Sequence, residues 1–178
     1  MFIGYCAKRD PALFCKLMNW TVLHVRPKCE KKMAAYCVYY AVACYLPLRR
    51  ETKVYQRRKV TVDKPLFPGY VFAEVSKDQR LTVLKSSTLV RIIEVGDQGR
   101  FVREIDQVRQ ALAIDATLGA TTALKHGKSV RITAGPFQGL EGVVVSVKGQ
   151  ARVVLNVDMI GQGVRVDVDA DALELLDE

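Results

Sequence analysis

The sequence predicts an α+β protein made of two small domains. From Trp20 onward, apolar and polar residues alternate as in strands, and between these runs apolar residues recur at helical intervals. After residue 124, glycines separate short β-branched runs, and seven of the twelve glycines lie between Gly127 and Gly163. We therefore expect an N-terminal α/β sandwich with an antiparallel sheet, followed by a small β-barrel.

The chain divides into four segments by composition. Residues 1–18 form an N-terminal extension without a readable pattern, and residues 19–114 form the first domain. The stretch 115–124, rich in Ala, Thr and Gly, is the expected linker, and 125–178 is the second domain. The start of the chain lacks a signal-peptide pattern, and its apolar runs are shorter than the ~20 residues of a membrane span. A cytoplasmic protein without membrane contact is expected.

The first domain opens with strand alternation over residues 20–25, and Pro27 then permits a helix to begin. A helical stripe of apolar residues follows. Its members are Cys29, Met33, Cys37, Tyr40 and Cys44. Residues 45–48 are expected to form a short strand, with Pro47 marking its edge or end.

A basic hairpin is expected next. Residues 53–55 and 59–62 alternate around a tip at 56–58. After a break at 65–69, residues 70–75 resume the alternation as a central strand.

The rest of the first domain alternates between helix and strand. Residues 77–86 have helical character through Leu81 and Leu84, and 89–95 form a strand closed by turn residues. Residues 104–113 form a helix with acidic residues in its first turn. Its apolar face consists of Ile105, Val108 and Leu112.

The second domain is read as strands with glycine turns between them. The expected strands are 129–133, 142–147, 151–157 and 163–168. Residues 169–175 fit either a single helical turn or a closing strand. The β-branched runs favour strands over helices, so we predict a constant barrel without a fold switch to helices.

Net charge is unevenly distributed. The total is +8, of which residues 1–113 carry +11 and residues 114–178 carry −3. A basic front half favours nucleic acid or an acidic protein surface, and the mildly acidic back half suggests a different partner.

No metal, cofactor or catalytic site is expected. The five cysteines include no closely spaced pair, so neither zinc nor a disulfide framework is predicted. Neither His24 nor His126 has a recognisable catalytic surround, and no phosphate-binding glycine loop is present. A non-enzyme is expected.

Two motifs resemble a known family. Residues 65–72 read Pro-Leu-Phe-Pro-Gly-Tyr-Val-Phe, which resembles the signature of the NusG N-terminal (NGN) domain. Residues 20–23 and 45–48 resemble that domain's first two strands. Residues 130–144, with Gly142, resemble a KOW motif. The resemblance runs from about Asn19 to the C-terminus, and it implies an RRM- or ferredoxin-like sandwich joined to an SH3-like barrel.

The resemblance implies a transcription elongation and antitermination factor. Members of the family bind the clamp helices of RNA polymerase, favour its forward-moving state and reduce pausing, which is a shift of conformational population. The KOW domain recruits the ribosomal protein NusE or the termination factor Rho. A monomer suits this tethering role. A general factor and an operon-specific RfaH-like paralogue both remain open.

By resemblance, three aromatic residues line the pocket for a clamp helix. These are Trp20, Phe67 and Tyr70. Trp20 fits pocket and core about equally. Alternation puts Tyr70 and Phe72 on one face of the strand; Phe72 is expected in the core, and Tyr70, at the start of the strand, can reach the surface. The contact to the polymerase gate loop falls near Thr82, although the polar motif that RfaH uses there is absent.

Basic residues of the hairpin are candidates for DNA phosphates, with a solvated loop tip as the alternative. They are Arg49, Arg50, Lys53, Arg57, Arg58 and Lys59. By resemblance to RfaH, contacts to the non-template strand fall at His24, Arg26 and Lys28. Phe137 and Leu140, on a tight loop of the barrel, are candidates for the NusE or Rho contact, with a barrel lid as the alternative reading of Phe137.

The strongest rival is an RNA-binding module of ribosomal or RRM-like type. Gly69-Tyr70-Val71-Phe72 faintly resembles an RRM stacking strand, and ribosomal proteins also carry KOW motifs. Pro68 and the lack of a second aromatic pair in the first strand argue against it.

Overall fold

The structure is a computed structural model that describes residues 20–55, 57–124, 127–147 and 150–176. Two compact units are present, and each is described by itself. The first contains residues up to Pro47 together with Pro65–Val102, and the second contains Leu48–Lys64 together with Arg103 onward. Cys6, Cys15 and His126, considered in the sequence, lie outside the described residues.

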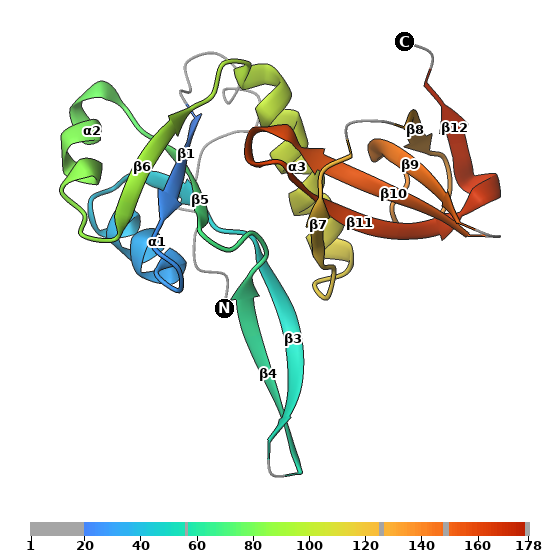
Figure 1. Cartoon of the computed structure of the whole chain (residues 1–178), viewed down its shortest axis with the longest axis horizontal. Helices are drawn as coiled ribbons and strands as arrows, with labels where there is room; N and C mark the ends of the chain where they lie inside the picture. Colours follow the sequence, from blue (N-terminus) through green and yellow to red (C-terminus); the bar gives the residue numbers. More distant parts are fainter. Residues whose placement is uncertain (1–19, 56, 125–126, 148–149, 177–178) are drawn as a thin grey trace. The chain divides into compact units, whose positions relative to one another are not determined.

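A four-stranded antiparallel sheet forms the first unit (Figure 1). Its order is β2-β5-β1-β6, where β1 is Trp20–Val25, β2 Ala43–Tyr45, β5 Tyr70–Glu74 and β6 Leu89–Glu94. In the centre, β1 and β5 pair with Val22 opposite Phe72 and His24 opposite Tyr70. The predicted central strand is confirmed.

The two faces of this sheet are covered by different helices. Helices α1 (Glu30–Tyr39) and α2 (Lys77–Leu84) are on one face, joined where the Tyr36 hydroxyl donates to the Thr82 carbonyl at 2.9 Å. Helix α3 (Gln98–Ile114) begins on the other face and ends in the second unit. There Phe101 packs on Phe72 with ring centroids 5.6 Å apart.

Helix α1 ends earlier than its apolar stripe predicts. Ala41 has a positive φ of 54°, a conformation that a helix cannot continue. Cys44 therefore lies in β2, where its thiol donates to the Ala34 carbonyl at 3.7 Å. The expected strand over 45–48 is displaced accordingly, since β2 ends at Tyr45 and the next strand starts at Leu48.

Helix α3 begins six residues before the prediction. The Asp97 carboxylate accepts the Arg100 N–H at 2.9 Å and so starts the helix at residues that look like a turn in sequence. The early start brings Phe101, which has 2% exposure, into the core. Glu104, expected in the first turn, lies a turn further on.

Helix α2 presents the opposite face from the one predicted. A capping box between Ser76 and Gln79 sets its start. Val83 is fully buried, whereas Leu81 and Leu84 are 69% and 50% exposed. The two leucines are therefore surface residues, and the expectation that they carry the apolar face was wrong.

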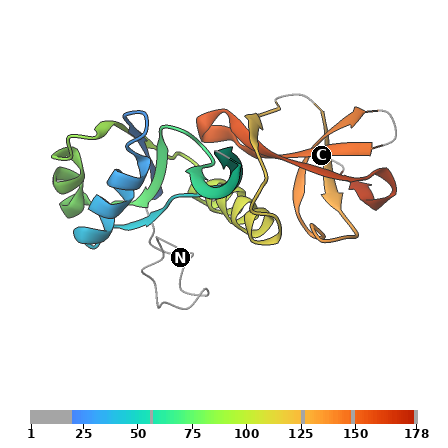
Figure 2. The ribbon, with the colours of Figure 1, turned by 90° about the horizontal axis from the view of Figure 1, so that it is seen from below.

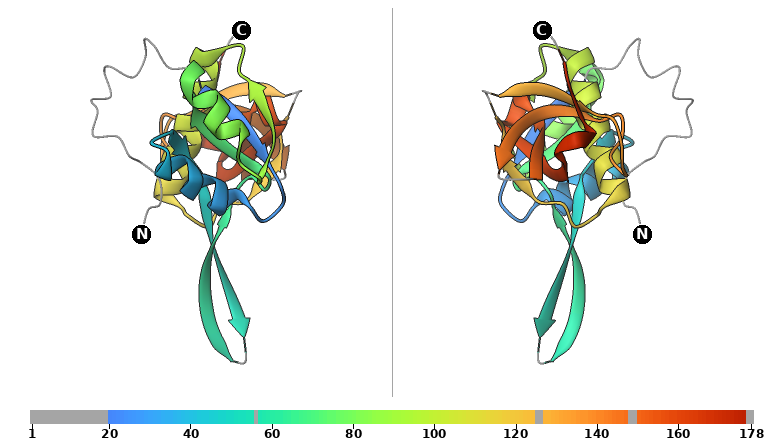
Figure 3. Two further views of the ribbon diagram at one scale, coloured as in Figure 1. Left: turned by 90° about the vertical axis from the view of Figure 1, so that its left-hand side faces the viewer. Right: turned by 90° about the vertical axis from the view of Figure 1, so that its right-hand side faces the viewer.

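The basic hairpin is present and longer than predicted. Strands β3 (Leu48–Tyr55) and β4 (Arg58–Pro65) form a two-stranded sheet and twist around one another (Figure 3). At the tip Arg57 has φ 66°, as hairpin turns with a right-handed twist require.

A six-stranded antiparallel sheet, curled around its interior, forms the second unit (Figure 2). Its order is β12-β8-β9-β10-β11-β7. The strands are β7 Ala120–Thr122, β8 Lys128–Ile132, β9 Glu141–Val147, β10 Gln150–Val157, β11 Gln162–Asp169 and β12 Leu173–Leu175.

Two details differ from the sequence reading. Part of the expected linker is a strand, because β7 pairs with β11. Residues 169–175 contain both alternatives, a 3₁₀ turn at Ala170–Ala172 and then the strand β12.

Candidate functional site

An aromatic pair lies half-buried at one end of the first unit's sheet. His24 and Tyr70 face each other across β1 and β5 with ring centroids 5.3 Å apart. The buried Glu30 carboxylate at the start of α1 accepts the Gly69 N–H at 2.7 Å. Gly69 has φ 85°, and its carbonyl accepts the Val25 N–H at 2.8 Å. These bonds fix the backbone immediately before Tyr70.

The other two predicted pocket residues belong to the core. Phe67 has 0% exposure and packs edge-to-face on Phe72 at 6.1 Å, so no partner reaches its ring in this conformation. Trp20 is 7% exposed, and both backbone groups of Trp20 bond to the Gln98 side chain, at 2.8 and 2.9 Å. We therefore leave both residues out of the proposed contact surface. Tyr70, as anticipated, keeps an accessible face.

A pocket lined by tyrosines of α1 and its C-terminal end was not predicted from the sequence. Tyr36, Tyr39 and Tyr40 line a concavity of about 420 Å³, in which the ring centroid of Tyr40 lies 4.6 Å from that of Tyr36 and 4.9 Å from that of Tyr39. Lys32 and Lys85 line it as well. Tyr40 belongs to the predicted apolar stripe and Tyr36 and Tyr39 lie beside it, so periodicity alone does not indicate that the three form a pocket.

Other predicted residues lie around this pocket. Thr82 is half-buried and offers its carbonyl to Tyr36. Arg26 and Lys28 are exposed, and the Arg26 N–H donates to the carbonyl of Thr88, a pocket residue, at 2.9 Å. His24 lies on β1 with its ring against Tyr70.

The hairpin brings its predicted basic residues together on one ribbon. Arg50, Arg57, Arg58 and Lys59 are exposed, and Arg49 and Lys53 are partly covered. One acid, Glu51, has three cationic neighbours: Arg49 at 2.9 Å, Lys53 at 3.4 Å and Lys64 at 2.9 Å. Hydrogen bonding and charge from Lys64, followed by those from Lys53, lower the pKa of Glu51 below its ordinary value.

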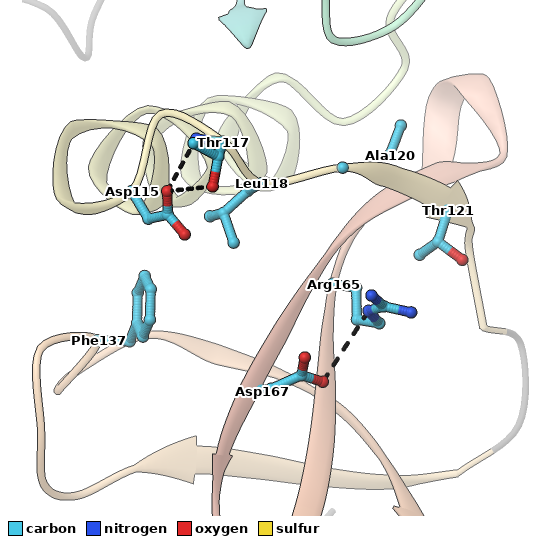
Figure 4. A pocket seen from close by; sticks show the side chains of 9 residues that line it. Asp115, Thr117, Leu118, Ala120, Thr121, Phe137, Arg165 and Asp167 are labelled. Carbon is cyan, nitrogen blue, oxygen red and sulfur yellow. Dashed lines mark hydrogen bonds and ion pairs between the residues drawn. The ribbon is translucent and has the colours of Figure 1, made fainter. Parts of the chain in front are cut away.

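Phe137 and Leu140 lie on the same barrel loop and both turn inward. Leu140 is 2% exposed and Phe137 is 9% exposed. Phe137 lines a pocket of about 390 Å³, with the Arg165–Asp167 ion pair on another side of it (Figure 4). The burial favours the lid reading for Phe137 and gives Leu140 a core role, while a partner contact through the rim of Phe137 stays a prediction.

Metal and thiol chemistry has no support in the described part of the chain. Among those residues, no group of three or more His, Cys, Asp or Glu could hold a metal ion. Cys29, Cys37 and Cys44 are free. A hydrogen bond with Cys44 and burial raise the pKa of the Cys37 thiol, which keeps it protonated. Across the described residues, no helix has the length and apolarity of a membrane span.

The comparison with protein families decides the identity. The family described as "Transcription termination factor nusG" matches residues 18–116, which is more than half of the chain, and the KOW motif matches residues 126–156. The chain belongs to the NusG family. The first match covers the sheet, the helices and the basic hairpin, and the second covers β8, β9 and most of β10.

Individual NusG proteins agree with this assignment. A "Transcription termination/antitermination protein NusG" of Staphylococcus carnosus is 30% identical over 139 residues, covering 74% of this chain and 76% of that protein. The protein of the same name from Lactococcus lactis is 28% identical over 120 residues, and the match spans 64% of its length.

A solved structure supports the fold. The structure described as "Domain interaction in Thermotoga maritima NusG" aligns with a TM-score of 0.51 at 20% identity, over 90% of this chain and 98% of that one. The chain thus has the two-domain fold of the NusG family, an NGN and a KOW domain.

Proposed function

We propose that the chain is a transcription elongation and antitermination factor that binds the clamp helices of RNA polymerase through the surface around Tyr70. Half-exposed aromatic rings beside a buried core are frequent sources of binding energy. The observation that carries the proposal is the His24–Tyr70 pair, held in place by the Glu30–Gly69 bond. Thr82 extends this proposal to the gate loop, and the KOW domain would recruit NusE or Rho.

The first test measures the affinity of the full chain for core RNA polymerase. Tyr70→Ala is expected to weaken binding by about tenfold, as for a residue at the centre of an interface. Leu175→Ala is the matched control, because Leu175 is an exposed apolar residue of the KOW barrel, which carries none of the residues proposed to contact polymerase. Polymerase binding that ignores Tyr70→Ala would contradict the clamp assignment.

The tyrosine pocket favours a second activity, binding of a single strand of nucleic acid. Exposed tyrosines stack on bases without regard to sequence, and Lys32 and Lys85 can neutralise phosphates. We expect Tyr39→Ala, which removes a ring with 81% exposure, to weaken binding of a single-stranded DNA probe about tenfold. Tyr70→Ala is the control.

Polymerase binding, measured beside binding of single-stranded RNA at two salt concentrations, also distinguishes the chain from a plain RNA-binding module. The elongation-factor proposal requires polymerase binding without nucleic acid. Strong RNA binding with a steep salt dependence, and no polymerase binding, would instead favour the RNA-binding alternative.

A further inference from the structure

One carboxylate of the hairpin is surrounded by cations. The Glu51 side chain is 23% exposed, and its three basic neighbours are more exposed, at 34% for Arg49, 40% for Lys53 and 38% for Lys64. The acid therefore lies at the centre and the cations around it. Lys64 was not among the residues predicted from sequence to bind nucleic acid.

The strand geometry explains why these four side chains meet. Residues two apart on a strand point to the same face, so Arg49, Glu51 and Lys53 share one face of β3. Lys64 reaches the same carboxylate from β4, where its ammonium donates to Glu51 Oε1 at 2.9 Å. The ribbon thus holds three convergent cations on one anion position.

We propose that this cluster is a binding site for a backbone phosphate of nucleic acid, and that Glu51 occupies the phosphate position while the protein is free. A phosphodiester carries one negative charge and oxygen acceptors like those of a carboxylate, so it satisfies the same donors. The inference rests on the expectation from the sequence that the basic hairpin contacts DNA, and it adds an internal competitor to that contact.

The competition has a measurable consequence. Exposed ion pairs contribute little, so the cations exchange partners readily, but a carboxylate that stays nearby still repels the incoming phosphate. Glu51→Gln keeps the side-chain size and removes the charge. We expect it to tighten DNA binding about three- to tenfold and to steepen the slope of log affinity against log salt by about 0.9, the value for one more phosphate contact.

The experiment compares variants of the full chain on a short duplex DNA and on one of its strands, at two salt concentrations. Asp63→Asn is the matched control, because it removes the same charge from β4 on the face opposite Lys64. The probe for which Glu51→Gln increases the affinity more, duplex or single strand, identifies the kind of nucleic acid whose phosphate the site binds.

A gain for Glu51→Gln clearly above that for Asp63→Asn, abolished by adding Lys64→Ala, supports the site. Equal gains would show a general charge effect and overturn it. Weaker binding by Glu51→Gln would also overturn it, because Glu51 would then serve to organise the cations. Polymerase binding, measured without DNA, is independent of these results, so failure here is distinguishable from failure of the proposed function.

Discussion

At the scale of single residues, the face to which a side chain points was easier to predict than whether another element buries that face. Tyr70 and Phe72 share one face of the strand, and the position of Tyr70 at the start of the strand correctly separated its accessible ring from Phe72, which has 0% exposure. Phe67 and Leu81 show the limit, since the aromatic expected at the surface is buried and the leucine expected inside is exposed. Coverage depends on which element packs on a face, and that is not encoded locally.

The burial of Phe72 and the exposure of Leu81 predict very different losses of stability on truncation. Phe72→Ala should cost about 3–5 kcal/mol of unfolding free energy, because it empties a well-packed site. Leu81→Ala should change it by less than about 0.5 kcal/mol. Trp20, the chain's single tryptophan, lies in the same unit, so its fluorescence during denaturant unfolding measures both. Equal losses would contradict the burial pattern.

At the scale of elements, most strands of both units were predictable because their alternation and glycine turns are local signals, whereas β2 and β7 were displaced or missed. The ends of the helices were not predictable. Helix α1 stops because of a backbone conformation at Ala41, and α3 starts early at Asp97 in a stretch whose glycines resemble a turn. The tyrosine pocket needs α1 and the segment before β6 together, so no single stretch of sequence contains it.

The side-chain contacts of the hairpin should change at acidic pH. The pKa of Glu51 is lowered in the folded hairpin, so the contribution of its ion pairs is complete above the ordinary carboxyl pKa of about 4.3 and is lost as pH falls through the lower folded value. Amide NMR signals of Thr52 and Thr61 should shift in that window. In Glu51→Gln this transition should be absent; its persistence would assign the effect to another group.

The KOW glycine should be intolerant of any side chain. A Cβ at Gly142 would lie 2.6 Å from the Val154 carbonyl oxygen and 2.6 Å from a Val153 methyl group. Gly142→Ala should therefore destabilise the barrel by about 1–3 kcal/mol through overpacking. Gly119→Ala is the control, because nothing lies within 4 Å of its Cβ position. Thermal unfolding followed by methyl NMR of the barrel valines distinguishes the two.

At the scale of the whole molecule, the NGN and KOW domains and their family were visible in the sequence. The sequence could not show that β3 and β4 group with the second unit, because compactness is a property of three-dimensional contacts. Polymerase, NusE, Rho and DNA are proposed partners: polymerase at the surface around Tyr70, NusE or Rho at the KOW domain, and DNA at the tyrosine pocket and the hairpin.

The second unit should keep its strands in every functional state. Its sheet joins β8 to β11 through long ladders, with eight residue pairs between β10 and β11 alone. Carbon chemical shifts of the full chain should report strands over 150–157 and 162–169, free and bound to polymerase. Helical shifts in either state would contradict the absence of a fold switch.

The hairpin also has a consequence for solubility. Within the described residues β3 and β4 form a sheet of two, so the ribbon has outer edges where another strand could pair, and Val54 and Val60 are 66% and 42% exposed on it. Its positive charge then has a protective effect, because two copies repel one another before their edges meet. Concentrated salt or a polyanion weakens this repulsion, so the conditions that mask the DNA-binding charge are also those in which the chain would begin to self-associate.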